Sequence, residues 1–485
     1  MRHAIYFLLA LFAHSAANQF SGFNLTALYG PGLSEGAEIV YASDADFQEE
    51  TAPRYTIYRP PRHYGAILPA TEADIQHIVR TSVGHGIPFL AIGGGHGITG
   101  TLGRSQSGIS IELKNFDKAD IDEANNVITI GGGVKYESLY GPMYNANKMM
   151  AMGNSPCVGA IGAALGGAVG QWQGLYGLGI DSLLSVRMIT ATGDLVVASE
   201  KENPDLFWSI RGAGANFGII TEATFQLHDA VNDGDVAVSM FLYTPDRNVS
   251  VWEAVRSFDD YMPDELAFNI AATINATTRE RSILVQANWY GLASEAEPYL
   301  QPFRDAGPFL VQNLALPWPE LQELTHTLDP RICTPGQYMN EFSISLKQTD
   351  IDTFTSFYSE INALWEREDR YTGQLVIARF PNRVVRSVPD SATVFPHRDA
   401  TTHLLFENFY SDPSLDGTIN KWMRETRARF QETSGFDELH VYSNFGQGDE
   451  GPRAWYGSRN FEKLRQLKRK WDPLGVFRYN NPIPW

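Results

Sequence analysis

The chain has 485 residues, of which 43% are hydrophobic and 12% aromatic. That is enough apolar material for about two or three packed domains, and it excludes an intrinsically disordered protein. The 38 basic and 56 acidic residues give a formal net charge of −18. A charge of this sign disfavours nucleic acid or an anionic membrane surface as a partner.

The first 17 residues have the layout of a cleaved secretory signal. Arg2 gives a basic start, an apolar run covers residues 4–13, and small residues stand at Ser15 and Ala17. A membrane anchor would need about 20 apolar residues, and this run is shorter. We therefore expect cleavage after Ala17 and secretion, or entry into the secretory-pathway lumen. Three Asn-x-Ser/Thr sequons agree with a secreted glycoprotein: Asn24, Asn248 and Asn275.

The sequence contains two cysteines, Cys157 and Cys333, and so predicts no disulfide framework. Whether the two pair with each other is left open. The histidines show no ligand spacing such as H-E-x-x-H, and no metal site is predicted.

The first clear pattern follows a proline-rich lead-in. Residues 66–68 are expected to form a short strand, and Thr71 to cap the next helix, with Asp74 completing a weak capping box. That helix should end at the glycines that follow it. A second strand then runs into the stretch FLAIGGGHGITG, residues 89–100.

This stretch matches a dinucleotide-binding fingerprint. Gly95, Gly97 and Gly100 satisfy G-x-G-x-x-G, and an acidic residue stands at a suitable distance at Asp117. A Rossmann site, however, needs a helix directly after the glycines to receive the pyrophosphate. Here GTLGRSQSG and then the alternating segment ISIELKNF follow, so we exclude a Rossmann site. The histidine inside the motif, His96, is then unexplained, because a phosphate needs only backbone N–H groups.

The next segments are predicted to be strands separated by a block of small residues. A hairpin is expected over 183–199, and a helix is expected after Asn203 as N-cap, with Pro204 in its first position. Nearly every side chain in residues 155–170 is small. Such a block can pack closely against a helix, and it also lets backbone amides approach a large flat ligand.

The amino-acid composition changes near residue 226, where glycine becomes rarer. Strands such as VAVSMFLY and RSILVQANWYG alternate with charged helical stretches, which predicts an antiparallel sheet with helices. We therefore expect an α+β protein with a first domain over 18–225 and a second over 226–435. The last segment, 436–485, contains a strand, a basic helix and an aromatic tail.

In this order the segments resemble the FAD-linked oxidases of the vanillyl-alcohol-oxidase superfamily, with a PCMH-type FAD-binding domain. The closest branch is that of the berberine bridge enzyme and its fungal relatives. The motifs that carry the resemblance are PFLAIGGGHG, SPCVGAIGAALGGAVG, LFWSIRGAGANFGIIT and NFEKLRQLKRKWDPLGVF. The resemblance implies a two-part FAD-binding domain and a substrate domain whose large antiparallel sheet is covered by helices. It also implies that residues 436–485 return to the FAD-binding domain.

The resemblance explains the histidine. In this family the glycine loop wraps the FAD pyrophosphate, and its histidine bonds covalently to a methyl group of the flavin ring. His96 occupies that position, although a loop histidine hydrogen-bonded to backbone is the alternative. The other residues that the resemblance places at FAD are Ile92, Gly93, Gly94, Gly95, Gly97, Ser155, Cys157, Gly159, Gly162, Ala163, Gly218, Ile220 and Asn444.

This chain departs from the family pattern at three positions. Ile92 replaces an arginine before the glycines, and Ile98 replaces a tyrosine found at many active sites. Ser155 stands where many relatives attach the flavin a second time through cysteine. Cys157, two residues further, lies on the same face of an extended segment and remains a possible second link. We expect single attachment through His96.

The family reaction transfers a hydride from a substrate C–H bond to the flavin, while a base takes a proton and O2 reoxidises the flavin to give H2O2. Ala164 aligns with a position where relatives control oxygen access. The base is open, because the family residue aligns nearest to Phe406, and a shift of one residue brings in Glu407. Strand alternation puts His403, Leu405 and Glu407 on one face. The candidates are Glu407, His403, Asp390 and Tyr442.

The residues and the resemblance leave three functions open. The favoured one is a secreted oxidase with covalent FAD that acts with O2 on a small secondary-metabolite alcohol or phenol. The second is a carbohydrate oxidase with an open aromatic groove, for which Trp289, Tyr290 and Trp318 are available unless these rings belong to the core. The third is a non-redox cyclase that uses the same fold. The oligomeric state and the exact substrate are left open.

Overall fold

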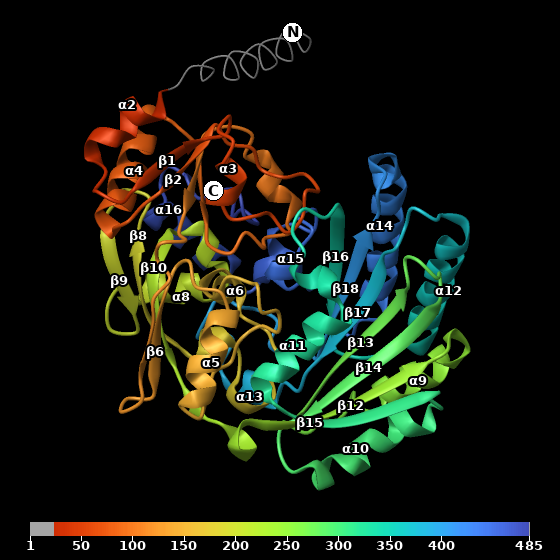
Figure 1. Cartoon of the computed structure of the whole chain (residues 1–485). Coiled ribbons are helices and arrows are strands. Elements are labelled where there is room, and N and C mark those ends of the chain that lie inside the picture. The colour runs from red at the N-terminus through yellow and green to blue at the C-terminus, as the bar shows by residue number, and fades with distance from the viewer. Residues whose placement is uncertain (1–23, 485) are drawn as a thin grey trace.

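The computed structural model describes residues 24–484 and arranges them around three main β-sheets (Figure 1). Two of these sheets lie in the N-terminal half of the chain, and the third, larger sheet follows them in sequence. The predicted signal segment, residues 1–17, lies outside the described residues. Within 24–484, no helix combines the length and the apolar character needed to cross a membrane.

The first sheet has the strand order β1-β2-β4-β3, with β2, β4 and β3 parallel. The predicted capping box is present: the Thr71 hydroxyl accepts from the Asp74 N–H, and the Asp74 carboxylate accepts from the Thr71 N–H. This helix ends at Gly86, whose φ of 65° is left-handed, as glycine allows. The elements are β1 Glu38–Tyr41, β2 Gly65–Leu68, β3 Phe89–Ile92, β4 Ile109–Glu112, α2 Leu25–Tyr29, α3 Phe47–Glu50, α4 Glu72–His85 and the 3-10 helix η2 Gly100–Arg104.

The second sheet is antiparallel, with the order β5-β6-β10-β8-β9. The predicted hairpin is confirmed as β8 and β9, with Gly193 at the turn. The helix begins as predicted, with Asn203 in the N-cap position and Pro204 in the first turn, but the Asn203 side chain does not cap it: this residue has a φ of 47°, and its Nδ2 donates to the Val197 carbonyl. The elements are β5 Ala119–Asp122, β6 Val127–Gly131, β8 Leu183–Ile189, β9 Leu195–Ser199, β10 Ile219–Gln226, α5 Glu137–Asn145, α6 Ala160–Gly166, α7 Gln173–Tyr176 and α8 Pro204–Ala213. A two-stranded pair, β7 Lys148–Met149 and β11 His228–Asp229, lies beside them.

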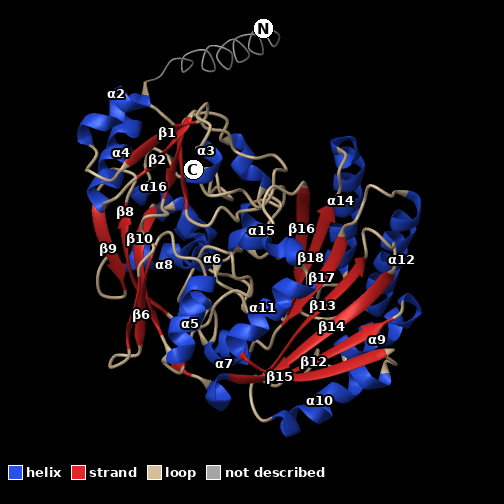
Figure 2. Ribbon diagram, in the orientation of Figure 1, coloured by secondary structure: helices blue, strands red, loops and turns tan. Residues whose placement is uncertain are grey.

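The third sheet has seven antiparallel strands in the order β15-β12-β14-β13-β17-β18-β16. Helices α9, α10, α12 and α14 cover its outer face, and the N-terminal half of the chain faces its inner side (Figure 2). This architecture confirms the predicted α+β class. The strands are β12 Asp235–Tyr243, β13 Leu266–Ile274, β14 Arg281–Trp289, β15 Leu310–Pro317, β16 Met339–Leu346, β17 Gln374–Arg379 and β18 Thr402–Phe409. The helices are α9 Asn248–Arg256, α10 Ala293–Asp305, α11 Trp318–Leu328, α12 Ile351–Arg367, α13 Arg383–Ser387, α14 Asp416–Glu432, α15 Pro452–Tyr456 and α16 Phe461–Trp471.

The two faces of the large sheet belong to different cores. Leu404 and Phe406 of β18 pack in the outer core with the covering helices, whereas Leu405 packs in the inner core with residues of the N-terminal half. The predicted alternation along this strand is therefore confirmed. At the C-terminus, the buried Lys468 of α16 donates to the Asn216 carbonyl and pairs with Asp472, which fixes this helix against the N-terminal half.

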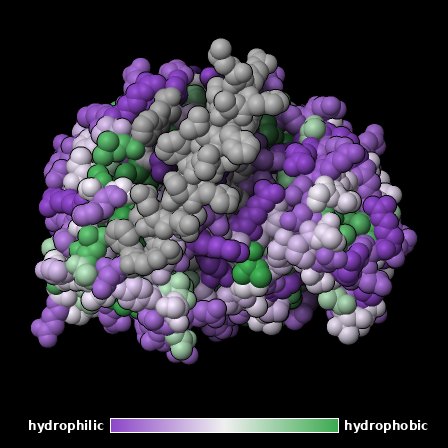
Figure 3. Space-filling view, turned by 90° about the horizontal axis from the view of Figure 1, so that it is seen from above, coloured by the Kyte–Doolittle hydropathy of each residue, from purple (hydrophilic) through white to green (hydrophobic). Residues whose placement is uncertain are grey.

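Much of the surface seen from above is hydrophilic, with apolar residues scattered in small groups (Figure 3). Among the sequons, Asn24 and Asn275 are exposed, whereas Asn248 is half-buried and its Nδ2 donates to the Pro245 carbonyl.

Candidate active site

The glycine loop between β3 and η2 is pressed between two neighbouring backbone segments. A Cβ on Gly94 would lie 2.5 Å from the Gly159 nitrogen, and one on Gly95 would lie 2.6 Å from the Pro53 carbonyl oxygen. Gly95 also has a φ of 70°. The glycines are therefore required by close backbone contact. The short helix η2 and then β4 follow the loop, so the described chain lacks the helix that a Rossmann site needs at this point.

An arginine from outside the motif holds the loop in place. The Arg54 guanidinium donates to the carbonyl of Gly95 at 3.2 Å and also to that of Gly97. Arg54 thus puts a positive charge beside the loop, where Ile92 supplies none. Local motif reading could not find it, because Arg54 belongs to a separate segment of the chain.

His96 stacks on the ring of Tyr55, with ring centroids 4.1 Å apart and an interplanar angle of 12°. Burial, followed by the charges of Arg54 and Lys135, lowers the pKa of His96 to about 4. The imidazole is therefore neutral at pH 7, with one ring nitrogen free to act as a nucleophile. Tyr55 is a second neighbour that the motif did not reveal.

The block of small residues is closely packed at one position and open at another. At Gly166 it packs tightly, because a Cβ there would overlap the Asn444 side chain. Gly162, by contrast, is exposed on α6, and among the described residues no atom lies within 4 Å of the place its Cβ would take. Asn444 crosses to this helix and donates to the Ala163 carbonyl at 2.8 Å. The glycine loop meets the start of α6 where Gly94 contacts Gly159, and the open face at Gly162 leaves room for the approach of a flat flavin ring.

Two of the predicted cofactor residues, Gly218 and Ile220, are held by packing around strands β8 and β10. A Cβ on Gly218 would lie 2.4 Å from the Met188 side chain, and Ile220 is buried in β10 against β8. Ser155 lies in the turn that leads to α6, where its carbonyl accepts from the Val158 N–H.

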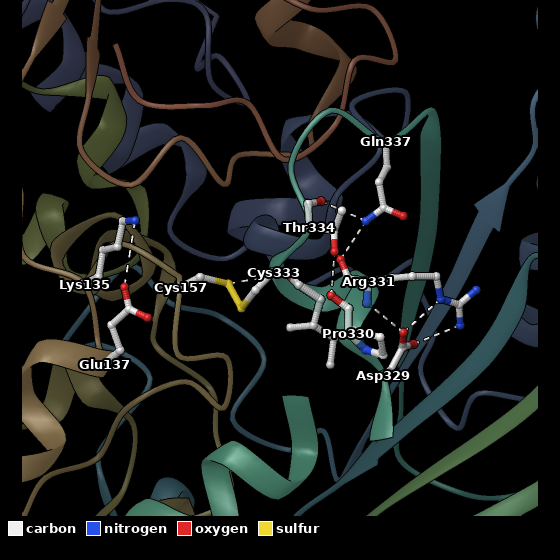
Figure 4. Close-up of a disulfide and its surroundings, with 10 residues drawn as sticks. Lys135, Glu137, Cys157, Asp329, Pro330, Arg331, Cys333, Thr334 and Gln337 are labelled. Atoms are coloured by element: carbon white, nitrogen blue, oxygen red, sulfur yellow. Dashed lines mark hydrogen bonds and ion pairs between the residues drawn. A yellow bond between two sulfur atoms is a disulfide. The ribbon is translucent and has the colours of Figure 1, made fainter. Parts of the chain in front are cut away.

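The sulfur of Cys157 is bonded to Cys333, with the two Cα atoms 5.7 Å apart (Figure 4). The bond joins the loop before α6 to the 3-10 helix η7, Pro330–Cys333, in front of the large sheet. A sulfur in a disulfide has no free valence for a flavin, so Cys157 as a second attachment point is wrong in this structure. The sequence left the pairing open because the two cysteines are 176 positions apart.

The inner face of the large sheet presents a group of buried carboxyl and amide side chains. Glu407 accepts from the Gln374 Nε2 at 2.6 Å, and the same nitrogen donates to Asp329 at 2.7 Å. Burial, followed by the charge of Asp329, raises the pKa of Glu407 to about 7, against the opposing effects of the Gln374 hydrogen bond and the Arg331 charge. Glu341 lies directly opposite Glu407 across the β16–β18 pair. Sequence reasoning missed it, because nothing in the local pattern of β16 marks it.

The other predicted bases occupy different surroundings. His403 Nδ1 is hydrogen-bonded to the Ser345 hydroxyl at 2.9 Å, and burial lowers the pKa of His403 to about 4. The Tyr442 hydroxyl accepts a hydrogen bond from the Asn444 Nδ2 at 2.7 Å, and burial raises the pKa of Tyr442 above the usual value. Asp390 does not join this group: its side chain is 44% exposed and forms an ion pair with Arg459.

The aromatic residues considered for a sugar-binding groove are buried. Trp289, Tyr290 and Trp318 are 5%, 2% and 0% exposed. Trp318 packs edge-on against Trp172, and Trp289 stacks on Tyr299. The prediction that these rings line an open groove is therefore wrong, because the rings are packed between elements in the interior.

Residues 65–199 match the model of an FAD binding domain, and residues 441–484 match the model described as berberine and berberine like. The FAD-linked oxidoreductase azaL of Aspergillus niger is 42% identical over 450 residues, covering 92% of this chain and 95% of azaL. The chain belongs to the berberine-bridge-like FAD-linked oxidoreductases. The FAD-linked oxidoreductase tazG of Aspergillus terreus, 40% identical over 97% of this chain and 96% of its own, agrees.

Solved structures share the fold of this family member at lower identity. BBE-like 1 of Physcomitrella patens has a TM-score of 0.82 at 21% identity, covering 95% of this chain and 99% of its own. The glucooligosaccharide oxidase of Acremonium strictum, a protein with a 6-S-cysteinyl, 8α-N1-histidyl FAD, has a TM-score of 0.82 at 20% identity over the same shares. These likenesses confirm the vanillyl-alcohol-oxidase fold. The protein is thus an FAD-linked oxidoreductase.

Proposed function

We propose that this enzyme is a secreted oxidase that removes a hydride from a C–H bond of a small alcohol or phenol and passes the electrons to O2. The observation that carries the proposal is the arrangement of a neutral His96 in the glycine loop opposite the polar inner face of the large sheet. Tyr55 connects the two, because it stacks on His96 and packs against Met339 and Phe409 of that sheet face.

We assign the attachment of the cofactor to His96 alone. Flavin, when bound, supplies the two-electron acceptor for the hydride. A neutral imidazole has the lone pair that would form a bond to a flavin methyl carbon as that carbon gives up a C–H bond, with O2 taking up the two electrons released, and the low pKa of His96 keeps that lone pair free. Arg54 holds the loop from behind, and α6 offers its open face at Gly162. Cys157 stays in its disulfide.

We assign the role of base to Glu407. As the hydride leaves the substrate carbon, the proton of the adjoining O–H passes to the Glu407 carboxylate, and the substrate becomes a carbonyl compound. A pKa of about 7 matches this task, since the group is then about half ionised near neutral pH and can both accept and release the proton. Gln374 holds the carboxylate in place through its amide. O2 then takes the two electrons with two protons and leaves as H2O2.

The disulfide supports a location in the secretory pathway. Disulfides persist in oxidising compartments and are rare in the cytosol. Together with the basic and apolar N-terminal segment, the Cys157–Cys333 bond agrees with a secreted enzyme.

The test uses the full-length secreted protein. Denaturation in acid should leave yellow flavin on the wild-type chain and release it from H96A, which has lost the attachment atom. Aromatic and aliphatic alcohols are then offered without air, and bleaching of the flavin is followed; admission of air should consume O2 and yield one H2O2 per substrate. E407Q should bind flavin normally and lose most of the bleaching rate. Product formation without O2 consumption would refute the oxidase and favour the cyclase.

A further inference from the structure

Glu341 and Glu407 form a pair of carboxyl groups on the inner face of the large sheet. They are directly opposite residues in the antiparallel pairing of β16 with β18. The side chains of opposite residues start from Cβ atoms about 4.5–5.5 Å apart and project from the same face. Both are buried, with exposed fractions of 5% for Glu341 and 9% for Glu407.

The two carboxyl groups have unequal partners. Glu407 accepts a hydrogen bond from the Gln374 amide nitrogen, and Arg331 donates a hydrogen bond to the oxygen of the same amide. Glu341 has no such support: its Oε1 is buried without a hydrogen-bond partner among residues 24–484, and no described Lys, Arg or His forms an ion pair with it. A negative charge is therefore better supported on Glu407 than on Glu341.

The remaining charged groups near the pair do not reverse this difference. Asp329 adds negative charge beside Glu407, but it is paired with Arg331. Glu450 raises the pKa of Glu341, and it is paired with the buried Arg427 at 2.9 Å. The Tyr55 phenol also faces the pair, and burial together with the two carboxyl groups raises its pKa, so it is neutral.

We propose that Glu341 holds a proton opposite Glu407 in the resting enzyme, so that when Glu407 is ionised the pair carries one negative charge and that charge lies on Glu407. Two like charges at this separation in a buried site cannot both persist. A protonated Glu341 has an O–H to donate and removes the repulsion that a second carboxylate would exert on Glu407. Glu341 is thus a positioning residue, acting through Glu407.

The proposal rests on the proposed function only for the catalytic meaning of Glu407. When Glu407 takes the substrate proton, the pair holds two protons and no charge. When that proton leaves to solvent, the pair returns to one proton and one charge, with Glu341 protonated throughout.

Infrared spectroscopy of the flavin-loaded enzyme tests the proton directly, because a protonated carboxyl has a C=O stretch that a carboxylate lacks and that shifts in D2O. Spectra are taken at about pH 8.5, above the usual pKa of Glu by several units. We expect a buried-carboxyl band in the wild type and its loss in E341Q. E112Q is the matched control, because Glu112 is also buried and its pKa is raised to about 7, so it is ionised in this experiment. No band in the wild type, or a band that survives in E341Q, overturns the proposal.

The coupling between the two groups is tested with E407Q. Removal of the neighbouring charge should lower the pH at which the Glu341 band disappears by about one unit or more. An unchanged midpoint would show that the carboxyl groups do not share a charge, and would also overturn the proposal. If E341Q fails to fold, the wild type and E407Q still decide the question. If Glu407 is not the base, substrate bleaches the flavin of E407Q at the wild-type rate, and the result of the infrared experiment is unaffected.

Discussion

Replacement of both cysteines by serine, C157S/C333S, tests the bond that joins the loop before α6 to η7. The bond spans a sequence separation of 176 residues. In the chain-entropy description, a cross-link over a loop of that length destabilises the unfolded chain by about 5 kcal/mol at room temperature. We therefore expect the free energy of unfolding to fall by up to about 5 kcal/mol in the double variant.

Urea unfolding, followed by tryptophan fluorescence, measures the loss. The double variant and the reduced wild type should unfold together, at a lower urea concentration than the oxidised wild type. Ser155→Ala, two residues away in the same loop, is the matched control and should leave the midpoint unchanged. Because the sulfur is not attached to flavin, C157S/C333S should also keep its acid-stable flavin. Equal midpoints for the double variant and the oxidised wild type, or flavin attachment that weakens in C157S, would refute this account of Cys157.

The remaining predictions concern the cofactor loop, the base and the sequons. R54M should reduce the amount of acid-stable flavin several-fold without unfolding the chain, because the Gly95 and Gly97 carbonyls lose their donor; absorbance after acid precipitation measures it, and R54K should recover part of the loss. The rate of anaerobic flavin bleaching should rise as pH passes through about 7 and fall about tenfold per unit below it, because only ionised Glu407 accepts a proton; a rate independent of pH between 5 and 9 would contradict this assignment. In secreted material, mass spectrometry should find glycan on Asn275, which is exposed, and none on Asn248, whose amide is already bonded to Pro245; glycan on Asn248 would show that this contact opens before glycosylation.

Local features of the fold followed directly from the sequence. The helix at Glu72–His85, with its Thr71–Asp74 capping box, and the β8–β9 hairpin are set by residues within a few positions of one another. The alternation in β18 was also predictable, because successive side chains of a strand point to opposite faces whatever the strand pairs with. Asn203 shows the limit: its side chain bonds to a neighbouring strand instead of capping its helix.

The sequence by itself therefore determined the family, the local elements and the glycine loop with its histidine, because short-range patterns and motifs carry this information. Only the tertiary structure decided which distant residues complete the site. Arg54 and Tyr55 reach the glycine loop from another segment, and Cys157 meets Cys333 across 176 positions. Glu341 faces Glu407 because β16 lies next to β18 at the edge of the sheet. Strand order is a property of the whole packed chain, and no local periodicity encodes it.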